Sequence, residues 1–105
     1  MLRIAICDDM PNELQNLVLL TNQYISAENL DAEVTKFSHP DALLIAIESE
    51  RFHIYILDIV MPVVNGLELG RQIRRLDRDS QIIYATTEPQ FALQAYAASP
   101  INYLI

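Results

Sequence analysis

Short apolar runs alternate with segments of helical period along the whole chain, and this alternation is the strongest constraint on its fold. Runs of four to six residues that are rich in Ile, Leu, Val and Tyr are typical of buried strands. Such runs lie at 2–7, 54–57, 81–85 and 101–105, and the segment 33–37 is also predicted to be a short strand. Helical spacing of apolar residues lies between them, at 11–27, from 38 onward, at 66–76 and at 89–98. This order predicts an α/β fold with a parallel sheet and helices on both faces.

Two of the predicted helices carry recognisable start signals. Pro11 suits a first helical turn, where its missing N–H is not needed. Ser38-His39-Pro40-Asp41 resembles a capping box, which would open the second helix at Ser38. The buried side of the first helix is predicted to hold Leu14, Leu17, Val18, Thr21 and Ile25, and that of the second Leu43, Leu44 and Ile47.

Aspartates follow two of the predicted strands. Asp8 and Asp9 come directly after the first strand, and Asp58 comes directly after the third. Because the carboxyl ends of neighbouring parallel strands meet at one crevice, we expect these three carboxylates to lie together. Such a cluster raises the proton affinity of its members or binds a hard cation such as Mg²⁺. An aspartate beside Mg²⁺ is able to act as a nucleophile toward phosphorus.

Length, charge and cysteine content restrict the class of protein. A chain of 105 residues is predicted to form one domain over 1–105. A net charge of −7 argues against direct contact with nucleic acid or with an anionic membrane. The single Cys7 excludes an internal disulfide and favours a reduced, cytoplasmic setting. Neither a signal peptide nor an apolar run long enough to span a bilayer is visible.

A set of motifs in order gives the chain a family resemblance. The acidic pair is followed 49 residues later by Asp-x-x-Met-Pro-x-x-Asn-Gly, then by an apolar strand that ends in threonine, then by an aromatic strand. These motifs are Asp8-Asp9, Asp58-Ile59-Val60-Met61-Pro62-Val63-Val64-Asn65-Gly66, Ile82-Ile83-Tyr84-Ala85-Thr86 and Asn102-Tyr103-Leu104-Ile105. Over its whole length the chain resembles the receiver domain of two-component response regulators. The resemblance implies a flavodoxin-like, doubly wound sheet with strand order 2-1-3-4-5.

The resemblance also implies roles for individual residues. Asp58 would accept a phosphoryl group from a histidine kinase, without turnover of an external substrate. Mg²⁺ would be bound by Asp9, Asp58 and the main-chain carbonyl of Val60, with Asp8 acting mostly through water. Thr86 would hydrogen-bond the phosphoryl group.

An aromatic residue on the last strand would complete the switch. The resemblance implies that Tyr103 changes rotamer between the two states. The physical reason is that an inward shift of Thr86 vacates space that a ring is able to fill, which makes a bistable element.

The chain departs from the family pattern at its C-terminus. Receiver domains carry a lysine three residues after the switch aromatic, a position that would follow Ile105. The last helix is missing too, so we interpret the chain as a C-terminally truncated receiver domain, and we expect such a chain to self-associate, for example as a homodimer. A weaker resemblance of Phe91-Ala92-Leu93-Gln94-Ala95-Tyr96 to LytTR-type regulators implies a DNA-binding output domain beyond residue 105.

Two other classes of protein are alternatives to a phosphorylated switch. A phosphatase of the haloacid-dehalogenase class needs a second aspartate two positions after its nucleophile. Neither Asp8 nor Asp58 is followed by one at that spacing, which excludes this class. A pseudo-receiver that binds partners without phosphorylation stays open. A basic stretch, made of Arg71, Arg74, Arg75 and Arg78, is predicted to be a solvated face.

Overall fold

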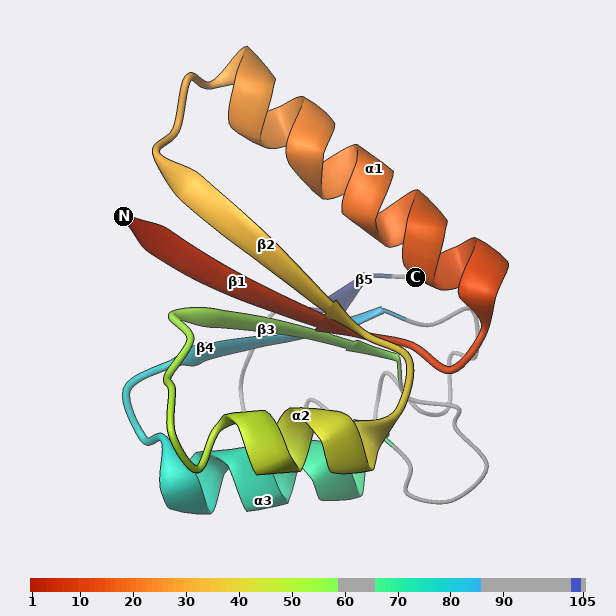
Figure 1. The fold of residues 1–105 in the computed structure, drawn as a ribbon. Helices are drawn as coiled ribbons and strands as arrows, with labels where there is room; N and C mark the ends of the chain where they lie inside the picture. Colours follow the sequence, from red (N-terminus) through yellow and green to blue (C-terminus); the bar gives the residue numbers. More distant parts are fainter. Residues whose placement is uncertain (59–65, 86–102, 105) are drawn as a thin grey trace.

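The computed structural model describes residues 1–58, 66–85 and 103–104, which form a five-stranded parallel sheet flanked by helices (Figure 1). The strand order is β2-β1-β3-β4-β5, which confirms the predicted order 2-1-3-4-5. The strands are β1 Leu2–Cys7, β2 Ala32–Phe37, β3 Ile54–Asp58, β4 Gln81–Ala85 and β5 Tyr103–Leu104. The helices are α1 Pro11–Ala27, α2 Pro40–Ala46 and α3 Gly66–Leu76.

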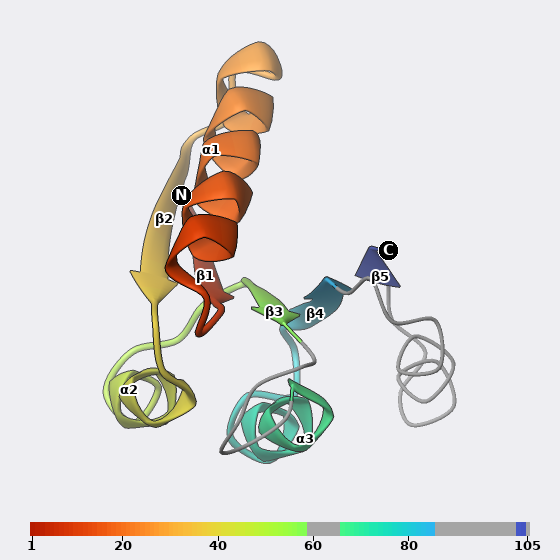
Figure 2. The ribbon, with the colours of Figure 1, turned by 90° about the vertical axis from the view of Figure 1, so that its right-hand side faces the viewer.

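The helices form a layer on each side of the sheet. Figure 2 shows α1 on one side and both α2 and α3 on the other. This arrangement confirms the predicted α/β, doubly wound fold. None of the helices in the described ranges has the length and apolarity that crossing a bilayer requires.

Two apolar clusters fill the space between the sheet and these layers. The larger cluster lies on the α2 and α3 side and includes Tyr55, Leu57 and Tyr84. The smaller cluster lies on the α1 side and includes Ile6 and Ile56. Because successive residues of a strand point to opposite faces, β1 and β3 contribute to both clusters, with Ala5 and Cys7 in the larger one and Ile4 and Ile6 in the smaller one.

The start of α2 differs from the sequence prediction. The N-cap is His39, not Ser38, and its Nδ1 accepts a hydrogen bond from the Asp41 backbone N–H at 3.1 Å. The capping-box prediction was therefore wrong by one residue. The reason is that Pro40 occupies the first helical position, which its fixed φ favours, so the cap is the residue before it.

The helix α3 approaches β4 so closely that a side chain at Gly70 would have to displace Tyr84. A Cβ atom added at Gly70 would lie 2.0 Å from the hydroxyl oxygen of Tyr84. Tyr84 is 3% exposed and belongs to the larger cluster. The absence of a side chain at Gly70 therefore makes room for the Tyr84 ring inside the core. Tyr84 itself lies two residues before Thr86, the predicted switch residue.

Several predicted features lie outside the described residues. These are the loop at 59–65, the helix at 89–98 and the side chain of Tyr103, of which only the strand backbone is described. Val60 and Thr86 also lie outside the described ranges.

Candidate functional site

Two buried carboxylates meet at the carboxyl edge of the sheet. Asp8 directly follows β1, and Asp58 is the last residue of β3. Cys7 pairs with Leu57 in the sheet, so the residues that follow them, Asp8 and Asp58, lie side by side at its carboxyl edge. Asp8 is 2% exposed and Asp58 is 7% exposed. The structure thus brings together two of the three aspartates that the sequence pointed to.

A third carboxylate joins them from the first turn of α1. Oxygen atoms of Asp8, Asp58 and Glu13 all lie within 4.8 Å of one another. Glu13 was not among the residues predicted from the sequence. The available signal was its position four residues after Asp9, in the first turn of the helix that follows the first strand.

Asp9 lies at the same edge but outside this close group. Its Oδ1 atom is buried and has no hydrogen-bond partner within the described residues. A buried carboxylate oxygen without a partner is costly, which points to a ligand that the described chain does not supply.

Burial and the concentration of negative charge at this edge raise the pKa of neighbouring groups. Burial raises the pKa of Asp8 above its usual value, and the charges of Glu13 and Asp9 raise it further. Hydrogen bonds from the Met10 N–H and with Asp58 act in the opposite direction. Burial likewise raises the pKa of the Cys7 thiol to about 12, and the neighbouring acids add to the effect. Cys7 is fully buried and acts as a small core residue.

No basic side chain balances this charge at Asp8 or Glu13. Every lysine, arginine and histidine of the sequence lies within the described ranges. None of the ion pairs in the described part of the chain involves Asp8 or Glu13. The donor set consists of carboxylate oxygens, which suits a hard divalent cation such as Mg²⁺.

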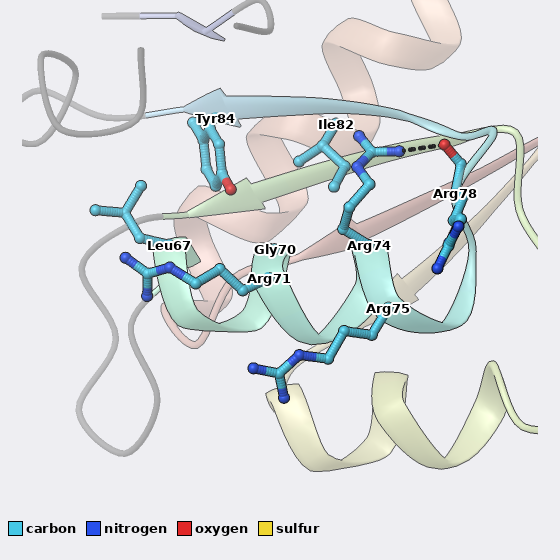
Figure 3. A pocket seen from close by; sticks show the side chains of 8 residues that line it. All are labelled: Leu67, Gly70, Arg71, Arg74, Arg75, Arg78, Ile82 and Tyr84. Atoms are coloured by element: carbon cyan, nitrogen blue, oxygen red, sulfur yellow. Dashed lines mark hydrogen bonds between the residues drawn. The ribbon is translucent and has the colours of Figure 1, made fainter. Parts of the chain in front are cut away.

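Most of the arginines lie on α3 and on the turn after it. Four of them line a groove with Leu67, Ile82 and Tyr84 (Figure 3): Arg71, Arg74, Arg75 and Arg78. Arg71 pairs with Glu68 at 2.8 Å, and the Arg74 guanidinium donates to the main-chain carbonyls of Arg78 and Ser80. Since Arg78 and Ser80 precede β4, these contacts lie toward the amino edge of the sheet, opposite the carboxylates.

Comparison with known families identifies the family to which the chain belongs. The family model described as response regulator receiver domain matches residues 4–105. The chain belongs to this family. Asp58, which the sequence resemblance implies to be the phosphoacceptor, lies at the acidic edge of the sheet.

Curated relatives include transcriptional regulators. The chain is 29% identical over 104 residues to the transcriptional regulatory protein LytR of Staphylococcus aureus (strain N315), covering 99% of this chain and 41% of that protein. It is 28% identical to the positive alginate biosynthesis regulatory protein of Pseudomonas aeruginosa, again covering 99% of this chain and 41% of the relative. The chain thus spans about two fifths of the length of these relatives.

Solved structures include receiver domains with the same architecture. The response regulator protein TrrA of Thermotoga maritima, described in complex with Mg²⁺-BeF, superposes with a TM-score of 0.78 and 27% identity, over all of this chain and 86% of that one. The chemotaxis protein CheY4 of Vibrio cholerae has a TM-score of 0.78 and 21% identity, and it shows likeness of fold alone.

Proposed function

We propose that this domain is a phosphorylation-controlled switch of a two-component system, with Asp58 as the phosphoacceptor. The observation that carries the proposal is the carboxylate cluster at the carboxyl edge, which no basic side chain balances at Asp8 or Glu13. A cytoplasmic histidine kinase would supply the phosphoryl group. Mg²⁺ would be held by Asp9, Asp58 and the main-chain carbonyl of Val60, with Asp8 acting mostly through water.

The reaction is a phosphoryl transfer between two nucleophiles. A carboxylate oxygen of Asp58 forms a bond to phosphorus while the bond from phosphorus to the imidazole nitrogen of the donor breaks. Bound Mg²⁺ would supply neutralisation of the charge on the carboxylates and on the phosphoryl oxygens. Asp58 is held in place by β3, which is central in the sheet, so its carboxylate is positioned before the donor arrives.

Two residues are proposed to read the phosphorylated state. Thr86 follows β4, the strand next to β3, and its hydroxyl would donate a hydrogen bond to a phosphoryl oxygen. Tyr103 lies on β5, where its backbone pairs with that of Tyr84 in β4. A shift at Thr86 would change the space available to the Tyr103 ring.

The output is proposed to be control of transcription through a separate domain. The relatives are named as regulatory proteins, and they extend well beyond the length of this domain. A net charge of −7 does not suit direct binding to nucleic acid, so DNA contact is assigned to an output domain of the LytTR type.

Phosphorylation by a small donor tests the assignment of Asp58. The full-length protein that contains this domain should gain one phosphoryl group from acetyl phosphate in Mg²⁺, as measured by mass spectrometry of the intact protein. Asp58→Asn should not, while the matched variant Asp79→Asn, in the turn before β4, should label like wild type. Equal labelling of Asp58→Asn would reject Asp58 as the acceptor.

The same experiment separates the switch from a pseudo-receiver. A wild-type protein that binds Mg²⁺ but takes no phosphoryl group, from acetyl phosphate or from a phosphorylated kinase, would favour the interaction module.

A further inference from the structure

We propose that Glu13 is an additional acidic determinant of the cation site, and that it raises the affinity for divalent cations through its charge. The inference rests on the proposed function, since it concerns the same Mg²⁺. It adds a residue on α1 to a site otherwise assigned to residues at the ends of strands.

The geometry places Glu13 at the rim of the site. It lies three residues after the N-cap of α1, and its carboxylate is within 4.8 Å of ligand oxygens of both Asp8 and Asp58. Glu13 is exposed, whereas the two aspartates are buried. It therefore faces the site from the solvent side.

A role for Glu13 in helix capping does not account for this position. In a capping box, a glutamate at the third helical position accepts a hydrogen bond from the N–H of the N-cap residue. Here the N–H of Met10, the N-cap, is already bonded to Asp8 Oδ1 at 2.9 Å. Within the described residues, Glu13 makes no hydrogen bond or ion pair of its own.

Charge at this distance has a direct effect on cation binding. A carboxylate close to two others is repelled by them in the cation-free state, and it is attracted to a divalent ion that binds among them. Oxygen-ligand sites tune their affinity partly by the number of charged ligands. A second observation points to a ligand at the same edge, because Asp9 Oδ1 is buried without a partner within the described residues.

Mg²⁺ titrations followed by backbone amide shifts test the role of Glu13. Glu13→Gln should raise the dissociation constant for Mg²⁺ about three- to tenfold. Glu13→Asp keeps the charge and should stay within about twofold of wild type. The control Glu48→Gln makes the same change in net charge after α2, near the amino edge of the sheet, and should also stay within about twofold.

The variants separate this inference from the proposed site itself. Asp9→Asn should weaken Mg²⁺ binding in any case, and melting temperatures should show that all variants are folded. If Asp9→Asn weakens binding while Glu13→Gln binds like wild type, Glu13 is only a helix-terminus acid and the inference is overturned. It is overturned too if Glu48→Gln weakens binding as much as Glu13→Gln. If wild type shows no Mg²⁺-dependent shifts, the cation site of the proposed function fails along with it.

Discussion

Replacing Asp8 with asparagine should make the cation-free protein more stable. Asp8 is 2% exposed and shares its surroundings with carboxylates of Asp58 and Glu13. Its one main-chain hydrogen bond, from the Met10 N–H, needs only an acceptor oxygen, which an asparagine side chain also provides. The substitution therefore removes a buried charge and its repulsion while keeping the local turn.

The separation of the oxygens sets the size of the effect. Two unit charges 4.8 Å apart repel by roughly 3.5 kcal/mol at an effective dielectric constant of about 20, and by roughly 0.9 kcal/mol at that of water. The raised pKa of Asp8 has the same origin, because burial and the charges of Glu13 and Asp9 disfavour its charged form. We expect a gain of about 1–3 kcal/mol in the free energy of unfolding, which corresponds to at least about 4–8 °C in Tm.

Thermal melts with a chelator and with Mg²⁺ measure this gain and its origin. With the chelator, Asp8→Asn should melt above wild type, and Asp79→Asn, an exposed residue before β4, should melt like wild type. Mg²⁺ at a hundredfold excess over its dissociation constant should stabilise wild type by about 2.7 kcal/mol, and it should stabilise Asp8→Asn much less. A cation-free Asp8→Asn that is less stable than wild type by more than about 1 kcal/mol would refute the argument from repulsion.

Three further predictions concern pH, packing and thiol reactivity. The pKa of Asp8 is raised above 3.8 in the folded protein, so above that pH the folded protein binds more protons than the unfolded chain. The contribution of Asp8 to the free energy of unfolding should therefore decrease as pH rises from 3.8. Urea titrations at several pH values should show this decrease in wild type and should not show it in Asp8→Asn. Gly70→Ala should destabilise the protein by about 1–2 kcal/mol, because the added methyl group overpacks against the Tyr84 hydroxyl. The loss should be smaller in a Tyr84→Phe background, which lacks that hydroxyl. Equal losses in both backgrounds, measured by denaturant unfolding, would contradict the close contact. Cys7, fully buried and with its pKa raised to about 12, should resist iodoacetamide in the folded protein and react once the chain is unfolded; mass spectrometry showing rapid labelling without denaturant would contradict its burial.

Periodicity was enough to predict the order and type of the described elements. The helix 66–76 was predicted with the bounds that the structure gives to α3, because its apolar positions repeat without interruption. Strand β2 begins one residue before the predicted 33, at Ala32, where small side chains give little signal. The cap of α2 was misplaced because Ser38 has the better intrinsic preference, whereas the proline after His39 decides the position.

The site was predicted only as far as strand ends determine it. Asp8 and Asp58 were found because a parallel sheet brings the ends of β1 and β3 together. Glu13 was missed because its proximity to Asp8 and Asp58 depends on the orientation of α1 relative to β1, which helical periodicity does not specify. The need for glycine at position 70 depends in the same way on how closely α3 approaches Tyr84.

The unequal interiors on the two sides of the sheet have an evolutionary consequence. In the described residues, the α2 and α3 side holds twelve buried apolar residues and the α1 side holds four. Successive residues of one strand, such as Cys7 and Ile6, belong to different interiors and so experience different constraints on volume. Across homologous sequences, substitution rates along β1 and β3 should therefore alternate with a period of two, with slower change at the positions that face α2 and α3.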